Sequence, residues 1–352
     1  MRLFRDLQAK ASAVLLIYTG GTIGMKERSG EEGLVPFDFG GIADEVPELR
    51  KFACRIDSFT FDPLIDSSDV EPALWQHLAR LIKERYDAYD GFVILHGTDT
   101  MAYSASALSF MLDGLRKPVI FTGSQLPIDR PRTDGKENLI SSVEIATAKD
   151  DEGRALVPEV CIFFDSKLFR GNRSTKVNAT GFDAFASPNY PALATAGINI
   201  KYNNRSIHYG SEKGRGLKIE TSLDTRVSIL KVHPGITEQV VRDILLGSQT
   251  RAVIIETYGS GNAISKDWFL DIIRESSASG KILINVTQCL SGDVNMNLYA
   301  TGRALKNAGV VSGYDCTTEA ALGKLFYLMG TCNDNEQVKL LMERNLKGEI
   351  SK

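Results

Sequence analysis

Histidine is rare in this sequence, and positive charge is not in excess. Four histidines occur among 352 residues, scattered along the chain. We therefore expect no histidine-rich metal site. The formal net charge is −3, so the chain offers no basic field that would attract nucleic acid or an anionic membrane surface. Neither nucleic acid nor a membrane is predicted as a partner.

Cysteine is also sparse. The five cysteines are odd in number and form no CxxC pair, which argues against a disulfide framework and against a zinc site. Reduced thiols suit a cytoplasmic protein. Residues 1–8 lack a continuous apolar segment, and the apolar run 13–17 is too short for the core of a signal peptide. We expect no secretion signal and no transmembrane span.

Common catalytic signatures are absent as well. The sequence contains no GxxxxGK[ST], HExxH or GxSxG motif, which mark phosphate-binding loops, zinc proteases and α/β-hydrolases. Residues 259–261 read Gly-Ser-Gly and match only the start of a dinucleotide-binding fingerprint. The chemistry must therefore be sought in other turns of the chain.

The first such turn is Thr19-Gly20-Gly21-Thr22. It follows the apolar run 13–17, which predicts a buried strand. Open α/β sheets place their ligands at the carboxyl ends of strands, and paired glycines let the backbone bend sharply and approach a ligand. The Thr22 hydroxyl beside exposed backbone N–H groups is compatible with a nucleophile, a phosphate cradle or a tight turn. This turn alone does not decide between them.

Two further strands end in similar turns. Residues 91–95 form an apolar run that leads into His-Gly-Thr-Asp-Thr at 96–100, and residues 118–121 lead into Thr-Gly-Ser-Gln at 122–125. Helical spacing follows each of these turns. Strands that alternate with helices predict a mostly parallel sheet with helices on both faces.

The length of the chain suggests about two domains. We expect a larger N-terminal α/β domain over 1–202, a linker over 203–226 where the charged, turn-rich sequence loses its periodicity, and a smaller C-terminal α/β domain with a parallel sheet over 227–352. In the second half, strands are predicted at 227–230, 252–255 and 282–284, helices at 238–246 and 268–273, and three helices at the end. The last helix is expected to carry Val338, Met342 and Leu346 on one face and to stop at Gly348.

Two threonines on two glycine turns, with a carboxylate beside one of them, suggest a specific chemistry. Thr22 and Thr98 offer hydroxyls, and Asp99 is adjacent to the second. A threonine hydroxyl needs a base to act as a nucleophile, and a lysine whose pKa is lowered by burial can supply one. Physical reasoning does not select the lysine. We expect His96 to be a structural residue at a strand end.

Seven segments resemble signature sequences of bacterial-type L-asparaginases, and their residues are similar to those of the cytoplasmic type I branch. They occur in order along nearly the whole chain, as TGGTIG at 19–24, DSSD at 66–69, HGTDTM at 96–101, TGSQLP at 122–127, RGNRSTK at 170–176, YGSGN at 258–262 and NVTQC at 285–289. The occurrence of both turns, at 19–24 and at 96–101, in one chain is highly specific for this family.

The resemblance implies a two-step hydrolysis of L-asparagine to L-aspartate and ammonia without a cofactor. Thr22 stands at the family's nucleophile position, and Thr98, Asp99 and Lys176 match its second triad. Lys176 would act as a base through Thr98. Which threonine attacks first is an open alternative, and we favour Thr22 because it borders the polar segment 26–33. Backbone N–H groups at the Gly97–Thr98 turn would stabilise the oxyanion.

The resemblance also implies how the substrate is held. Ser67 would bind the α-carboxylate at the start of a helix expected from about residue 72 to 86, with Ser68 beside it. Asp99 would pair with the α-ammonium group, and Ser124 would meet the side-chain amide through its backbone carbonyl. Asn262 would reach the site of a neighbouring subunit, because family sites form between two chains. A homotetramer made of two close dimers is expected.

Two departures from the family pattern affect these expectations. Leu34 occupies the position of a lid tyrosine that often bonds the nucleophile. A basic residue of the regulatory asparagine site in some type I enzymes is replaced by Glu256 or Thr257, so that regulation is not predicted. Two alternatives on the same fold are kept: an amidase subunit of a tRNA-dependent amidotransferase, and a non-catalytic amino-acid sensor. The first would need an extra N-terminal β-barrel and a basic surface, and the second would lack site residues that are present here.

Overall fold

The apolar run at the start of the chain forms a central strand of a large sheet. The computed structural model describes residues 12–27, 34–36, 42–209 and 216–352. Strand β1 (Ser12–Tyr18) lies between β4 (Cys54–Thr60) and β5 (Gly91–Leu95) and runs parallel to both. Its side chains are almost completely buried, as expected for a strand covered on both faces.

The large sheet is mixed, with a parallel majority. Its strand order is β13-β12-β9-β8-β7-β5-β1-β4. Five neighbouring strands are parallel, namely β4, β1, β5, β7 (Val119–Thr122) and β8 (Val160–Phe164). The other three are antiparallel to their neighbours: β9 (Lys167–Arg170), β12 (Ala194–Thr195) and β13 (Lys201–Tyr202). The mostly parallel sheet is confirmed.

The antiparallel edge begins at a hairpin that the sequence analysis did not identify. Only Asp165 and Ser166 separate β8 from β9, and both have positive φ angles, 46° and 62°. A connection this short can join only antiparallel strands, since a parallel crossover needs a dozen or more residues.

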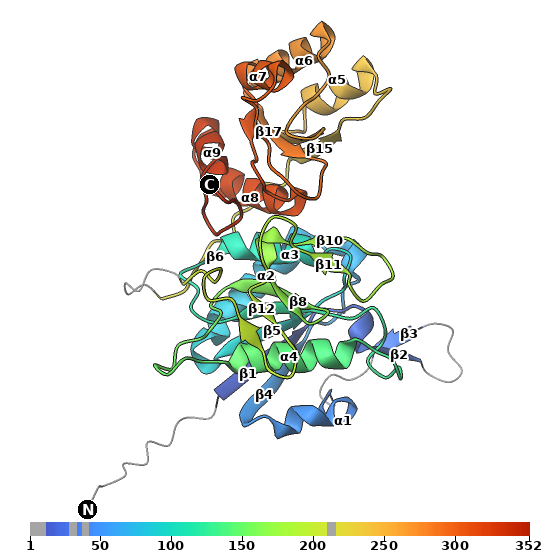
Figure 1. Ribbon diagram of the computed structural model, residues 1–352, viewed down its shortest axis with the longest axis vertical. Coiled ribbons are helices and arrows are strands. Elements are labelled where there is room, and N and C mark those ends of the chain that lie inside the picture. Colours follow the sequence, from blue (N-terminus) through green and yellow to red (C-terminus); the bar gives the residue numbers. More distant parts are fainter. Residues whose placement is uncertain (1–11, 28–33, 37–41, 210–215) are drawn as a thin grey trace, which may run out of the picture.

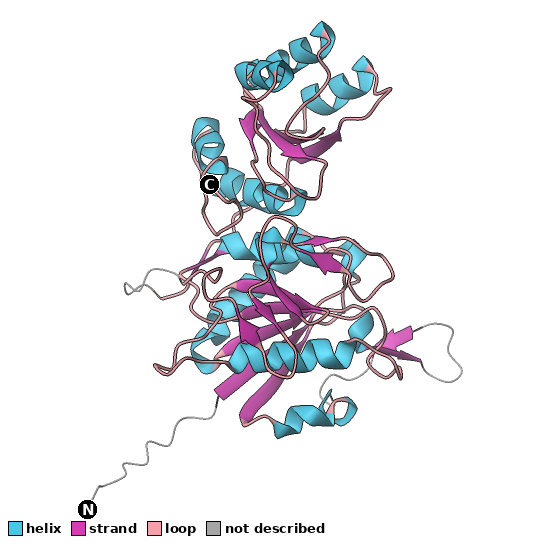
Figure 2. Ribbon diagram, in the orientation of Figure 1, coloured by secondary structure: helices cyan, strands magenta, loops and turns pink. Residues whose placement is uncertain are grey.

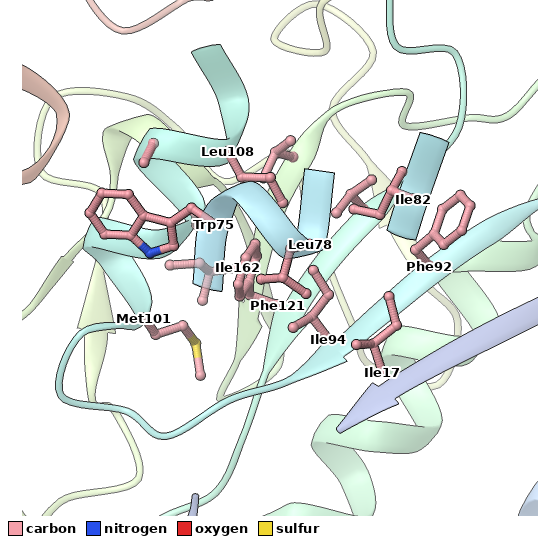
Figure 3. Close-up of a cluster of buried hydrophobic side chains, with 14 of the residues drawn as sticks. Ile17, Trp75, Leu78, Ile82, Phe92, Ile94, Met101, Leu108, Phe121 and Ile162 are labelled. Atoms are coloured by element: carbon pink, nitrogen blue, oxygen red, sulfur yellow. The ribbon is translucent and has the colours of Figure 1, made fainter. Parts of the chain in front are cut away.

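Helices cover both faces of the large sheet (Figure 1). Helices α2 (Pro72–Arg85) and α3 (Met101–Met111) lie on one face, and α4 (Gly135–Thr147) lies on the other. Alternate residues of the strands supply the two cores. Figure 3 shows the first core, in which Ile17 and Ile94 face Leu78 of α2. The turns that follow β1, β4, β5 and β7 all lie at the carboxyl edge of the parallel strands.

The C-terminal domain contains a smaller, fully parallel sheet, as predicted (Figure 2). Its strands follow in order as β15 (Val227–Lys231), β16 (Ala252–Thr257), β17 (Ile282–Thr287) and β18 (Val311–Ser312). Its helices are α5 (Glu238–Leu246), α6 (Asp267–Ala278), α7 (Ala300–Asn307), α8 (Thr318–Thr331) and α9 (Asn335–Met342). Helix α8 packs against α3 of the N-terminal domain.

The last helix is shorter than predicted. Helix α9 ends at Met342, so Leu346 and Gly348 lie beyond it. The Gly348 carbonyl accepts hydrogen bonds from Arg173 Nε (2.6 Å) and Arg170 Nη1 (3.3 Å). Two buried arginines of the other domain therefore hold this part of the chain in a turn, which helical periodicity does not reveal.

Several short elements complete the described chain. Strands β2 (Met25–Glu27) and β3 (Leu34–Pro36) pair in antiparallel fashion, and residues 28–33 of the expected loop lie outside the described residues. Strand β14 (Lys218–Ile219), within the expected linker, pairs with β6 (Leu112–Asp113). The remaining pieces are α1 (Ile42–Glu45), β10 (Thr175–Lys176), β11 (Phe185–Ala186) and several 3₁₀ turns. Within the described part of the chain, no helix has the length and apolar character needed to cross a membrane.

Candidate active site

The turns at the carboxyl edge of the large sheet touch one another directly. A Cβ atom built on Gly21 would lie 2.5 Å from the backbone nitrogen of Gly97. A Cβ atom built on Gly97 would in turn lie 2.5 Å from Ser67 Oγ. Only glycine permits such contacts. The sequence-predicted turns around Thr22, Ser67 and Thr98 are therefore assembled into one site.

The Thr22 turn is supported by a hydrogen bond from Tyr18. Residues Thr22–Gly24 form a 3₁₀ turn that Gly21 precedes with φ of 94°. The Tyr18 hydroxyl donates a hydrogen bond to the Gly21 carbonyl (3.4 Å). Burial raises the pKa of Tyr18, so its phenol stays protonated at neutral pH. Among the described residues, no hydrogen bond reaches the Thr22 hydroxyl, which leaves it available to a ligand.

Lys176 connects two of the predicted catalytic residues. Its Nζ atom lies 2.8 Å from Thr98 Oγ1 and 2.7 Å from Asp99 Oδ1. The lysine side chain is 20% exposed and the Asp99 side chain 63% exposed, so the contact lies at the surface of the site. Lys176 belongs to β10, which pairs with β11. A lysine that touches this hydroxyl can exchange a proton with it once the amine is neutral.

His96 is a buried structural residue, as predicted. It is 1% exposed, and burial lowers its pKa from 6.5 to about 4. Trp75 Nε1 donates to Ser104 Oγ (2.8 Å), which lies 3.0 Å from His96 Nε2. A carbonyl only accepts, so the Nδ1 atom beside the Gly97 carbonyl carries the proton of the neutral ring, and Nε2 accepts from the Ser104 hydroxyl. His96 Nδ1–H then donates to the Gly97 carbonyl (2.7 Å) and steadies the turn that carries Thr98.

Ser67 and Ser68 differ in their surroundings. Ser67 is buried against Gly97, and its carbonyl accepts a hydrogen bond from Thr100 Oγ1 (2.7 Å). The exposed Ser68 donates through its hydroxyl to Asp66 Oδ1 (2.8 Å). Hydrogen bonds from the Ser68 backbone and hydroxyl lower the pKa of Asp66. The expected position of Ser67 at the start of a long helix is wrong: it lies on a separate 3₁₀ turn, Ser67–Asp69, before α2.

Ser124 lies on the neighbouring turn after β7. A Cβ atom built on Gly123 would lie 2.5 Å from the His96 carbonyl oxygen, so this turn adjoins the Thr98 turn. Ser124 is 2% exposed, and its hydroxyl donates to the Leu126 carbonyl. Among the described residues, no donor reaches the Ser124 carbonyl oxygen, so this acceptor is available to a ligand.

Asn262 and Glu256 lie in the C-terminal domain. Asn262 Oδ1 accepts a hydrogen bond from Thr301 Oγ1 (2.8 Å), and no hydrogen bond in the described part of this chain joins Asn262 to Thr98 or Lys176. Glu256 accepts one from Thr318 Oγ1 (2.7 Å) and lies 3.6 Å from Lys231 Nζ. Thr257 is buried and donates to Asn285 Oδ1 (2.6 Å). The carboxylate at 256 is thus already paired.

Sequence reasoning missed several residues that shape the site. Tyr18 looks like one more apolar residue of a buried strand, and Ser104 like one of several serines on a helix. In the sequence, Asp134 precedes a helical pattern and carries no further signal, although its carboxylate accepts hydrogen bonds from the backbone of Gln125 and Leu126. The available signal for Tyr18 was its phenol hydroxyl at the end of the apolar run, two residues before the paired glycines. The other two depend on contacts between distant segments.

The residues that meet here suit acid–base and nucleophilic chemistry. Among the described residues, no group of three or more His, Cys, Asp or Glu side chains could hold a metal ion. The site instead presents two threonines, a lysine, a carboxylate and free backbone groups at adjoining turns. Such a set can attack a carbonyl carbon, transfer protons and stabilise an oxyanion.

Comparison with known proteins agrees with this chemistry. The family described as "Asparaginase, N-terminal" matches residues 13–208, and "Glutaminase/Asparaginase C-terminal domain" matches residues 226–342. L-asparaginase 1 of Escherichia coli K12 is 45% identical over 96% of this chain and 98% of its own length. The human 60 kDa lysophospholipase is 41% identical over 96% of this chain and 61% of its own length.

Solved structures agree with the sequence relatives. The crystal structure of L-asparaginase I from Vibrio cholerae is 41% identical to this chain and covers 97% of it and 100% of the Vibrio chain, with a TM-score of 0.86. At this identity and coverage the similarity extends over both domains of the chain. The chain therefore belongs to the asparaginase family, in its type I branch, and is an amidohydrolase.

Proposed function

We propose that this enzyme hydrolyses L-asparagine to L-aspartate and ammonia, with Thr22 as the nucleophile. The observation that carries the proposal is the contact of Lys176 with both Thr98 and Asp99, on a turn that touches the turn of Thr22. The similarity to L-asparaginase 1 of Escherichia coli over nearly the full length of both chains supports the choice of substrate.

The reaction proceeds by two displacements. Thr22 Oγ1 attacks the side-chain amide carbon, and its proton passes through Thr98 to Lys176, which acts as the base. The tetrahedral intermediate collapses with departure of ammonia, which takes up the proton, and a β-aspartyl ester of Thr22 remains. Water then attacks this ester, and its proton passes through Thr98 to Lys176. Lys176 returns a proton through Thr98 to the departing Thr22 Oγ1, which releases L-aspartate and restores the Thr22 hydroxyl.

The oxyanion formed in each step needs fixed donors. Backbone N–H groups at the Gly97–Thr98 turn are suited to this role, because His96 holds the Gly97 carbonyl on the opposite side. Loss of one such donor costs about 3 kcal/mol of transition-state stabilisation. Leu34 provides no hydroxyl to activate Thr22, so we assign proton removal to the Thr98–Lys176 pair.

The substrate is oriented by groups at the same edge. Ser67 and Ser68 would receive the α-carboxylate, Asp99 the α-ammonium group, and the Ser124 carbonyl the amide nitrogen. Asp99 is the most exposed of the catalytic group, which suits a residue that faces substrate. Its carboxylate would be shared between Lys176 and the α-ammonium group.

We further propose that the protein acts in the cytoplasm as a homotetramer of two close dimers, in which Asn262 completes the site of a neighbouring subunit. The division at 1–202, 203–226 and 227–352 would leave the catalytic residues in the first part and Asn262 in the last. Size-exclusion chromatography with light scattering tests the assembly. A monomer with full activity would contradict a shared site.

The function is tested by a steady-state titration of purified enzyme with L-asparagine. Ammonia and L-aspartate should appear in equal amounts without added metal or nucleotide. Absence of ammonia release at any asparagine concentration would refute the proposal. The same titration with L-glutamine measures specificity, since one extra methylene changes the discrimination by about 1–3 kcal/mol.

A further inference from the structure

The carboxylate of Asp134 is placed where it would normally cap a helix, but it has a different partner. Asp134 occupies the N-cap position of α4, and its side chain makes no capping hydrogen bond to that helix. Both of its oxygens instead lie 3.0 Å from the backbone nitrogen of Gln125, and Oδ1 also accepts from the Leu126 nitrogen (3.2 Å). The side chain therefore holds the turn that carries Ser124.

The peptide group held in this way includes the Ser124 carbonyl. A trans peptide is planar, so the N–H of Gln125 and the C=O of Ser124 point in opposite directions. Two carboxylate oxygens on the N–H side fix the plane and direct the carbonyl away from Asp134. A charge-assisted hydrogen bond at the N–H also polarises the peptide and strengthens its carbonyl as an acceptor. Among the described residues, that carbonyl has no donor of its own.

Other contacts hold the rest of the turn. Asn138, which is 2% exposed, donates through Nδ2 to the Gly123 carbonyl (3.0 Å) and to Asp134 Oδ2 (3.3 Å). Thr133 Oγ1 donates to the Leu126 carbonyl (3.1 Å). A Cβ atom built on Gly135 would lie 3.2 Å from Ser124 Cβ and 3.3 Å from Ile23 Cγ1. The start of α4 thus touches both the Ser124 turn and the Thr22 turn.

We infer that Asp134 is a positioning residue that makes the site select an amide over an ester. The inference rests on the proposed function, in which the Ser124 carbonyl accepts a hydrogen bond from the N–H of the substrate's side-chain amide. An ester of the same acid has no N–H to donate. A carbonyl that is fixed and polarised by Asp134 therefore favours amide hydrolysis and contributes nothing specific to ester hydrolysis.

The test compares two substrates that differ only in the leaving group, which is an amino group in one and a methoxy group in the other. Values of kcat/KM are measured with L-asparagine, by ammonia release, and with the β-methyl ester of L-aspartate, by methanol release. The enzyme is tested as the wild type, Asp134→Ala and Asp134→Asn. The matched control is Asp334→Ala, which removes an N-cap aspartate that bonds its own helix through the Gln337 nitrogen (2.8 Å) in the other domain. Thermal unfolding shows that each variant is folded.

The inference gives a specific pattern. Asp134→Ala should lower kcat/KM for asparagine by about tenfold or more, as expected for loss of one oriented hydrogen bond. The same substitution should lower kcat/KM for the β-methyl ester by less than about threefold. Asp134→Asn keeps one carbonyl oxygen for the Gln125 N–H and should lose less than the alanine variant. For Asp334→Ala, the ratio of kcat/KM for asparagine to kcat/KM for the ester should equal that of the wild type.

Two results would overturn the inference. One is an equal loss with both substrates in Asp134→Ala, which would make Asp134 a residue of general stability. The other is an unchanged asparagine value in a folded Asp134→Ala variant. Failure of the wild type to release ammonia would instead refute the proposed function, so the two failures are distinguishable.

Discussion

The side-chain nitrogen of Lys176 lies 2.8 Å from the hydroxyl oxygen of Thr98. The two residues are 78 positions apart in the sequence, and they come from a two-residue strand and from the turn after β5. This contact gives Thr98 a partner that can accept its proton once the lysine amine is unprotonated, and Asp99 holds the same nitrogen from the other side.

Replacement of this lysine should remove most of the activity. Lys176→Met keeps a long unbranched side chain but cannot accept a proton, so ammonia release from asparagine should fall by about 10²- to 10⁴-fold. Lys167→Met, which changes an exposed lysine of β9, is the matched control and should keep wild-type activity. A Lys176→Met enzyme with more than about a tenth of wild-type activity would show that another group removes the proton.

The contact between the Thr22 and Thr98 turns should be intolerant of a single methyl group. Gly21→Ala would place Cβ 2.5 Å from the Gly97 nitrogen and 2.6 Å from its Cα, at a φ of 94°. Gly235→Ala has a similar φ of 88° and no atom within 4 Å, so it isolates the backbone strain, about 1–2 kcal/mol. Chemical denaturation should show a larger loss of stability for Gly21→Ala, and only that variant should lose asparagine hydrolysis. Equal effects would contradict the packing of the two turns.

Protonation of His96 should contribute to acid unfolding. The unfolded chain binds this proton below about pH 6.5, whereas the folded protein binds it only near pH 4. Stability is therefore complete above pH 6.5 and falls as the pH decreases towards 4. A shift from 6.5 to about 4, at about 1.4 kcal/mol per pH unit, corresponds to about 3 kcal/mol.

Urea unfolding at several pH values measures this contribution of His96 to the free energy of unfolding. His96→Gln should lose less stability than the wild type between pH 7 and pH 4, by about 3 kcal/mol. His233→Gln, which changes an exposed histidine, should keep the wild-type dependence. If His96→Gln and the wild type lose stability in parallel, His96 is not the buried neutral base that the hydrogen bonds indicate.

Local patterns predicted the elements of this fold well. The apolar run before Thr22 is β1, and the helix expected at 238–246 is α5 with the same bounds. Hydrophobic periodicity reports on burial along one segment, so it succeeds where one face or both faces of an element are covered. It also placed Thr22, Thr98 and Ser124 on turns after strands, which the sheet topology brings to one edge.

What the sequence did not reveal depends on contacts between segments. The end of α9 at Met342 follows from the way Arg170 and Arg173 bind Gly348, and no local signal indicates those arginines. The role of Asp134 also depends on a loop eight and nine residues away from it. Lys176 was selected by family resemblance and not by physical reasoning, because many lysines were available until the fold placed one beside Thr98.

The central claim is that Thr22 forms the covalent intermediate. Enzyme mixed with L-asparagine is quenched in acid before steady state, digested with pepsin and analysed by mass spectrometry, with Thr22→Ala as the control. The account predicts an aspartyl ester on the wild-type peptide that contains Thr22, and no ester and no turnover in Thr22→Ala. An ester located on Thr98, or near-normal ammonia release by Thr22→Ala, would contradict it.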